Sequence, residues 1–416
     1  MTAVVGILNK RAVAIAADSA STSSTGKIFN KANKIFSLSK KHPVGIMIHN
    51  NDSFMETPWD VIIKMYRVKL GANTFNSLDE YKDDFLNFLR SQNFFSDTAH
   101  QSLELNRFFY GISSSEYRLT VEEVGTSDHV VFLNTYKKKI QNRINIFSAR
   151  TEFLPDFIGY TKVDFDTFTA PSIKEVFDAT FKPHGIAIDQ ETELLLKEVF
   201  YRQLIVKEFS TLVYTGIVFT GFGETEIFPS LIPIQIYFAF DNKLRYFVNT
   251  DSINKIDHLN SSAIATFAQA DVMLTILTGI APDLQDTYNL NFNKLLSQYD
   301  QILTNIYPNT DKSDLLLALN KVDKAIISDS IISSMNKVIQ EKYVNPLYQA
   351  VAGLSIEDLS EMAESLIYLT YLQRRITNAE ESVGGPVDVA VLSKGDGFVW
   401  IKRKQYFKDE LNSQFF

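Results

Sequence analysis

Three residues near the start of the chain have side chains that could together build a nucleophile. Thr2 follows the initiator methionine, Asp18 comes sixteen residues later, and Lys34 sixteen residues after that. If Met1 is removed, Thr2 carries a free α-amine, whose reference pKa of about 7.7–8.0 lets it accept a proton near neutral pH. This amine can serve as the general base for the Thr2 hydroxyl, to which it is covalently tethered.

Asp18 and Lys34 could support that nucleophile. An ammonium group beside Thr2 would lower the pKa of the α-amine and stabilise negative charge that develops on the hydroxyl, while Asp18 would keep the ammonium charged and oriented. Simpler interpretations stay open, because Thr2 can be an ordinary strand start and Asp18–Lys34 a structural ion pair, which alone is the commoner role. The joint spacing of the three residues favours the chemical interpretation.

Strands must position these residues. Residues 3–8 and 12–17 are small, apolar, β-branched runs separated by Asn9-Lys10-Arg11, which predicts a hairpin covered on both faces. A polar loop is expected over 19–26 and another buried strand over 44–48. Two helices should follow: Thr57-Pro58 marks the start of the first, and a Ser77/Glu80 capping box opens the second.

The rest of the chain predicts strands and helices in alternating blocks. Residues 94–210 are expected to form an insertion that contains strand-like runs at 116–124 and 129–134 and ends in a helix over 189–210. Residues 284–350 are expected to form a helical insertion, and Ser355 with Asp358 is a capping box for a long helix. The other expected elements are strands at 215–222, 231–240, 244–248, 387–392 and 398–402 and a helix at 267–280.

Composition excludes several classes of function. The 416 residues are 45% hydrophobic and 22% charged, so the chain can bury a core, and the net charge of −8 without a basic stripe disfavours nucleic acid. The absence of Cys removes disulfides, thiolate zinc sites and a Cys nucleophile. We expect no signal peptide, no membrane span, no metal and no cofactor, and hence a cytoplasmic location. Phosphate-binding, serine-elbow and zinc-protease motifs are missing.

The spacing of Thr2, Gly6, Asp18 and Lys34, with Ala16-Ala17 before the aspartate, resembles the opening of proteasome β-subunits and HslV-type peptidases. These are N-terminal-nucleophile (Ntn) hydrolases, and the long helix, Gly384-Gly385 pair and final hairpin are also similar to theirs. The resemblance implies an α+β fold, a four-layer αββα sandwich. It implies one domain over 1–416 with its core in 2–93, 211–280 and 351–404, interrupted by insertions at 94–210 and 284–350.

The resemblance also implies roles for individual residues. Thr2 would be the nucleophile and base, Asp18 the partner of the lysine, Lys34 the activator, and the backbone N–H of His49 the donor to the oxyanion. Glu380 or Glu381 stands where the family has a supporting aspartate, while Val383 and the region Ala268-Gln269 stand where it has serines. The residues implied in substrate binding are Ser21 and Thr22 at the cleft and Ala32, Phe36 and Met47 in an apolar specificity pocket.

The expected function is that of a threonine peptidase that cleaves peptide bonds with Thr2. Its substrate would be a peptide or unfolded protein, and the resemblance implies a homo-oligomer and a possible ATP-dependent unfoldase partner. Two alternatives stay open: an Ntn amidohydrolase acting on a small amide, and a catalytically silent assembly or interaction protein.

Overall fold

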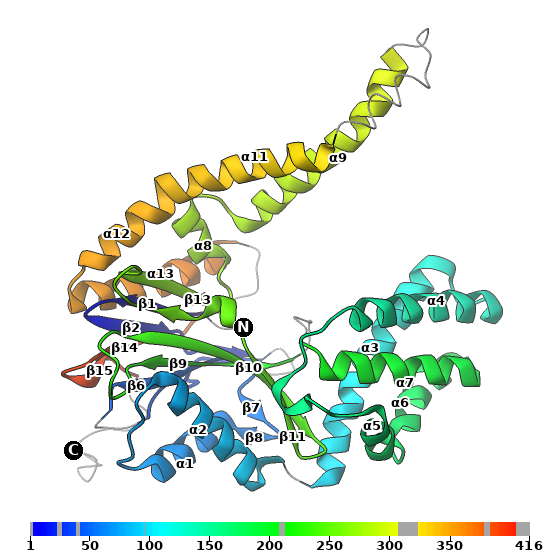
Figure 1. Cartoon of the computed structure of the whole chain (residues 1–416), viewed down its shortest axis with the longest axis horizontal. Coiled ribbons are helices and arrows are strands. Elements are labelled where there is room, and N and C mark those ends of the chain that lie inside the picture. The colour runs from blue at the N-terminus through cyan, green and yellow to red at the C-terminus, as the bar shows by residue number, and fades with distance from the viewer. Residues whose placement is uncertain are drawn as a thin grey trace.

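The protein is a mixed α/β chain with two large antiparallel sheets, as shown in a computed structural model (Figure 1). The structure describes residues 3–22, 27–38, 42–95, 97–207, 213–306, 323–377 and 383–404. The first sheet has the order β13-β1-β2-β14-β15, and the second has the order β11-β10-β9-β6-β5, with β12 paired to β10.

The first sheet contains the predicted N-terminal hairpin at its centre. Its strands are β1 (Val4–Asn9), β2 (Ala12–Ala17), β13 (Ser262–Phe267), β14 (Asp388–Ser393) and β15 (Gly397–Lys402). Every residue of β1 and β2 is buried, as their continuous apolar sequences predict. Register brings the start of β1 beside the end of β2, with Val4 opposite Ala17. Residue 3 therefore lies next to Asp18.

The second sheet packs with one face against a face of the first. Its strands are β5 (Ile35–Ser37), β6 (Val44–Asn50), β9 (Thr215–Gly221), β10 (Ser230–Phe240), β11 (Lys243–Val248) and the short β12 (Asn254–Lys255). Two separate two-stranded sheets are formed by β3 (Ser21–Thr22) with β4 (Ile28–Phe29) and by β7 (Ser53–Phe54) with β8 (Thr57–Pro58).

Three hydrophobic clusters show how the elements pack. One joins the facing sides of the two sheets through residues such as Leu8, Val13 and Val218. A second covers the first sheet with α8 (Asp271–Thr278), α12 (Asn345–Gly353) and α13 (Ile356–Ile376). The third covers the second sheet with α1 (Trp59–Leu70), α2 (Leu78–Ser91) and residues 94–206. Figure 1 shows these helices outside the sheets.

Residues 98–205 form a bundle of helices beside the second sheet. They are α3 (Thr98–Val124), α4 (His129–Ser148), α5 (Lys162–Thr169), α6 (Ile173–Phe181) and α7 (Gln190–Ile205). The expected strand-like runs at 116–124 and 129–134 are wrong, because both lie inside helices. The buried residues Leu105, Phe109, Ile112 and Tyr117 recur at helical spacing and decide the fold of this segment.

Residues 282–306 and 324–339 form helices of an arm that extends from the body (Figure 1). It consists of α9 (Pro282–Ile306) and α11 (Lys324–Ile339), and a π-helical turn at Gln340–Val344 leads into α12. The expected helix at 267–280 begins only at Asp271, since the residues before it form the edge strand β13 paired with β1. The capping box of Ser355 and Asp358 is confirmed.

Candidate active site

The structure brings Asp18 and Lys34 together as a buried ion pair. The Nζ of Lys34 lies 2.6 Å from Oδ1 of Asp18, and the two residues are 4% and 1% exposed. Asp18 directly follows β2, and Lys34 directly precedes β5, so the pair bridges the two large sheets. Lys34 also donates to the carbonyl oxygen of Ala20. A buried ion pair needs such additional hydrogen bonds to offset its desolvation.

Three backbone amides complete the shell around the Asp18 carboxylate. Ala3 donates to Oδ1 at 3.0 Å, and Ala20 and Gly384 each donate to Oδ2 at 3.1 Å. The backbone amide of Asp18 in turn donates to the carbonyl oxygen of Ala3 at 3.2 Å. Asp18 therefore fixes the backbone of the residue that follows Thr2 and holds Lys34 beside it.

Burial lowers the pKa of Lys34 from its ordinary value of 10.5, although the charge and hydrogen bond of Asp18 oppose that change. A second ion pair stands nearby, in which Lys404 donates through its side chain and its backbone amide to Asp388. The positive charge of Lys404 lowers the pKa of Lys34 further, and the carboxylate of Asp388 raises it. A lysine with a lowered pKa can exchange a proton closer to neutral pH than a free lysine can.

Two of the predicted catalytic residues, Thr2 and Glu381, lie outside the described residues. Their roles stay predictions.

Three of the residues expected to bind substrate, Ser21, Thr22 and Ala32, lie between Asp18 and Lys34 in the sequence. Ser21 and Thr22 form β3, and the hydroxyl of Ser21 is 3.5 Å from Oδ2 of Asp52. The amide of Ala32 donates to the carbonyl oxygen of Ser19 at 3.0 Å.

Phe36 and Met47 do not line one pocket. In β5 and β6, Met47 lies opposite Ile35 and packs between the two sheets, whereas Phe36 belongs to the cluster on the helix-covered face of the second sheet. Successive side chains of a strand point to opposite faces, so the two residues are separated by the sheet itself. The structure therefore does not assemble the expected specificity pocket from Ala32, Phe36 and Met47.

His49 lies within β6 rather than in a loop after it, opposite Gly216 of β9. Its ring stacks on Phe267 with 5.4 Å between ring centroids, and Nδ1 has no hydrogen-bond partner among the described residues. Burial lowers the pKa of His49 to about 4, although the hydrogen bond that the ring donates to the side chain of Asn50 opposes this change. The positive charge of Lys34 adds to the lowering. His49 is therefore neutral near pH 7.

The backbone amides of residues 48–50 at the end of β6 do not all point in the same direction. The amide of Ile48 donates to the carbonyl oxygen of Lys34 at 2.9 Å. Successive N–H groups of a strand point to opposite sides, so we infer that the His49 amide faces β9 and the Asn50 amide faces the same side as Ile48. Asn50 also has a positive φ of 67°, which ends the regular strand there.

Two features of this site do not follow from local sequence patterns. Gly384 contacts Asp18 from 366 residues away, and no local pattern predicts such a contact. Ala268 and Gln269 both have positive φ, at 49° and 21°, directly after the strand residue paired with Val4. The amide oxygen of Gln269 accepts a hydrogen bond from Nε of Arg374, which fixes this turn beside the N-terminal strand.

A cavity of about 420 Å³ opens between β13 of the first sheet and β6 and β10 of the second. His49, Phe267 and Ala268 form the part of its wall nearest to β1, and Gln235, Asn249 and Asp251 make the remainder polar. Because Phe267 pairs with Val4, this cavity lies beside the start of the N-terminal strand.

Comparisons with known proteins give no family for the chain. No protein-family model matches it, and no curated protein matches it. Two solved structures of Anbu from Hyphomicrobium sp. strain MC1 match over most of their length. The (Gly-1) mutant is 9% identical to this chain, with a TM-score of 0.31, and the match covers 98% of this chain and 88% of the mutant chain. The other Anbu structure is 10% identical to this chain, with a TM-score of 0.29, and the match covers 100% of this chain and 93% of the Anbu chain.

These results correct the expected family. Assignment to the proteasome β-subunits and HslV-type peptidases is wrong, because no family model matches and the two solved structures named above are of Anbu, at 9% and 10% identity. Similarity at this level carries no argument about activity. The spacing of Asp18 and Lys34 must therefore be interpreted from the geometry of this chain.

No helix within the described ranges is long and apolar enough to cross a membrane. Those same residues hold no group of three or more His, Asp or Glu side chains that could bind a metal ion.

Proposed function

We propose that the protein is an N-terminal threonine hydrolase that cleaves peptide bonds with Thr2 after Met1 is removed. One observation carries this proposal: Oδ1 of Asp18 accepts both the amide of Ala3 and the Nζ of Lys34. Thr2 precedes Ala3 in the chain, so this shared carboxylate supports a role for the buried Lys34, whose pKa is lowered, in the chemistry of Thr2.

In the proposed mechanism, Oγ of Thr2 attacks the carbonyl carbon of a peptide bond and loses its proton to the α-amine or to a neutral Lys34. The tetrahedral oxyanion accepts a hydrogen bond from the backbone amide of Asn50. The C–N bond then breaks, and the leaving amine takes up the proton. Water hydrolyses the resulting ester, which releases the acid and restores the Thr2 hydroxyl.

The architecture proposed for this activity is one domain of four layers, αββα, over residues 1–416. Its core comprises 2–93, 211–280 and 351–404, and 94–210 and 284–350 are insertions. The three hydrophobic clusters support that layering, because each joins one pair of adjacent layers. The proposed substrate is a peptide or unfolded protein, and a homo-oligomer stays a prediction for light scattering to test.

Intact mass and covalent labelling test the proposal. The mature chain should lack Met1, and a β-lactone should acylate Thr2 once per chain, as located by peptide mass spectrometry. Lys34→Ala should slow labelling at least a hundredfold, as expected for loss of a proton-transfer group. The matched control is Lys182→Ala, which removes an exposed lysine paired with Asp178 and should leave labelling unchanged. Retained Met1 in protein from the native host, or equal labelling of both variants, would overturn the proposal and favour a silent interaction protein.

A further inference from the structure

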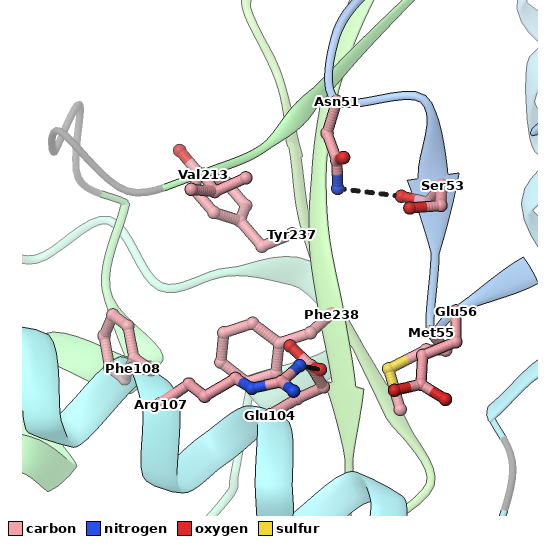
Figure 2. A pocket seen from close by; sticks show the side chains of 10 residues that line it. All are labelled: Asn51, Ser53, Met55, Glu56, Glu104, Arg107, Phe108, Val213, Tyr237 and Phe238. Carbon is pink, nitrogen blue, oxygen red and sulfur yellow. Dashed lines mark hydrogen bonds and ion pairs between the residues drawn. The ribbon is translucent and has the colours of Figure 1, made fainter. Parts of the chain in front are cut away.

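A second cavity, of about 340 Å³, opens where the helical bundle meets the end of β6 (Figure 2). Met55 and the aromatic residues Phe108, Tyr237 and Phe238 provide its apolar wall, and Glu104 and Arg107 stand at its rim. Phe108, Glu104 and Arg107 come from α3, and Tyr237 and Phe238 come from β10. The cavity therefore exists only because residues 98–124 pack against the second sheet.

One part of the wall is apolar and buried, and the other lining residues include the polar Asn51, Ser53 and Glu56. Met55, Phe108, Tyr237 and Phe238 are each less than 9% exposed, and the rings of Phe108 and Phe238 lie 5.6 Å apart. The Sδ of Met55 accepts a hydrogen bond from the amide of Ala239 at 3.5 Å, which fixes the thioether in place. Ligand sites are typically of this volume and have mostly apolar walls with a few polar groups.

The charges around the cavity disfavour a charged occupant. Glu104 and Arg107 form an ion pair with one another at the rim. Behind the wall, the guanidinium of buried Arg245 lies 4.4 Å from the ring centroid of Tyr237 and 5.1 Å from that of Phe108. A cationic side chain would meet that positive charge through the rings, and an anionic one would lose its hydration against four apolar residues. An uncharged, bulky side chain suits the cavity best.

Backbone strain is concentrated at the same place. Met55 and Glu56 occupy the two central positions of the turn between β7 and β8 and have φ values of 46° and 64°. Turns of this kind normally use Asn and Gly, because positive φ is unfavourable for other residues. Such strain persists where surrounding contacts enforce it, and it clusters at ligand-binding sites. Here it directs Met55 into the cavity wall.

The cavity also lies close along the chain to a contact of Lys34. Asn51, which lines it, is three residues along the chain from Ile48, whose amide contacts the carbonyl of Lys34. At a rise of about 3.3 Å per residue, that separation is roughly 10 Å, or about three residues of an extended peptide.

We propose that this cavity is a subsite for a bulky apolar side chain of the peptide substrate, about two or three residues from the cleaved bond. The subsite rests on the proposed peptide hydrolysis, and it gives residues 98–124 a direct role in substrate choice.

Binding to the Thr2→Ala variant tests the subsite without requiring catalysis. Calorimetry would compare blocked hexapeptides that carry Phe, Leu, Ala or Asp at one position in an otherwise identical sequence. Burial of a phenylalanyl or leucyl side chain should tighten binding about tenfold or more relative to Ala. Val213 lines the cavity and is 76% exposed, so Val213→Trp should block the mouth without disturbing the core. Val163→Trp is the matched control, because Val163 is 73% exposed on α5 and lines none of this cavity.

The expected result is a preference for Phe and Leu that Val213→Trp abolishes and Val163→Trp preserves. Equal binding of the Phe and Ala peptides, or equal affinities for the two Trp variants, would overturn the subsite. If the preference holds but protein with an intact Thr2 cleaves none of the peptides, the proposed hydrolase activity fails while the binding site stands.

Discussion

The amide of Ala3 and the ammonium of Lys34 donate to the same oxygen, Oδ1 of Asp18, at 3.0 and 2.6 Å. One atom thus couples the position of the N-terminal strand to that of the buried lysine. A carboxylate oxygen has two lone pairs, so Oδ1 can accept both hydrogen bonds at once. Any change at Asp18 should therefore disturb the backbone and the charge together.

Asp18→Asn should reduce both stability and labelling of Thr2. An amide can replace only one of the two carboxylate oxygens, so its NH₂ group would face either the donors on Oδ2 or those on Oδ1. Some buried donors would then have no acceptor, and Lys34 would have no charged partner. Together these losses should cost about 3 kcal/mol of unfolding free energy. Urea denaturation measures the loss. Asp178→Asn removes one partner of an exposed ion pair with Lys182 and should cost less than about 1 kcal/mol; similar losses in both variants would contradict a structural role for Asp18.

Lys34→Arg should separate the charge of the lysine from its ability to exchange a proton. Burial lowers the pKa of Lys34, so a neutral lysine forms at lower pH than an ordinary lysine would allow. Guanidinium stays protonated throughout and cannot accept the Thr2 proton. If Lys34 takes part in proton transfer, the labelling rate of the unmodified chain should continue to rise above the pKa of the α-amine, whereas that of the variant should level off there.

Stopped-flow labelling between pH 6 and 10 would record these profiles. Identical profiles would show that Lys34 acts only through its charge and that the α-amine is the base.

Local sequence patterns predicted the parts of the fold that local forces determine. The apolar runs around Asn9-Lys10-Arg11 form the expected hairpin, because a short polar turn between buried β-branched runs has few other solutions. The capping box at Ser355 marks the start of α13 for a similar reason. Asp18 and Lys34 were identified from spacing alone, and they do form an ion pair.

Contacts between distant segments could not be predicted in that way. The edge strand at 262–267 is Ala-rich and follows no strong strand pattern, but pairing with β1 satisfies its backbone groups. Residues 116–124 contain strand-favouring Tyr and Val, yet packing of their neighbours in a helical bundle outweighs that propensity. The contact of Gly384 with Asp18 depends on the whole fold, and so does the place of His49 inside a strand.

Gly216→Ala should destabilise the protein because His49 occupies the space that a side chain would need. A Cβ at position 216 would lie 2.0 Å from Nε2 of His49. Overpacking of this kind costs about 1–3 kcal/mol. Gly111→Ala is the control: no atom lies within 4 Å of its added Cβ in α3, so it should stabilise the helix by about 0.5–1 kcal/mol.

Combining Gly216→Ala with His49→Ala should recover part of that loss. Removing the imidazole clears the clash, so the double variant should be more stable than the sum of the single effects by about 1 kcal/mol or more. Chemical denaturation of the four proteins in the cycle gives this coupling energy. Additive effects would contradict direct contact between the two positions.

Glu56→Gly should stabilise the protein, unlike most substitutions to glycine. Glu56 has a φ of 64° in a two-residue turn, and a left-handed conformation costs a non-glycine residue about 1–2 kcal/mol. Relief of that strain outweighs the added entropy of the unfolded chain, so a gain of about 0.5–1 kcal/mol is expected. Glu122→Gly, at an exposed position of α3, should instead cost about 1 kcal/mol. Thermal unfolding of both variants would reveal the opposite signs.

His49 should make the folded state sensitive to mild acid. Its pKa falls from 6.5 to about 4 on burial, so between those values the unfolded chain binds a proton that the folded chain excludes. The contribution of neutral His49 to the unfolding free energy is therefore fully present above pH 6.5 and is lost as pH falls toward 4. The difference between the two pKa values corresponds to about 3 kcal/mol. His49→Phe keeps an aromatic ring against Phe267 and cannot titrate, so it should flatten the dependence of unfolding free energy on pH in this window. If His49→Phe retains the full loss of stability between pH 6.5 and 4, the acid sensitivity arises from other groups and the imidazole is not kept neutral by the fold.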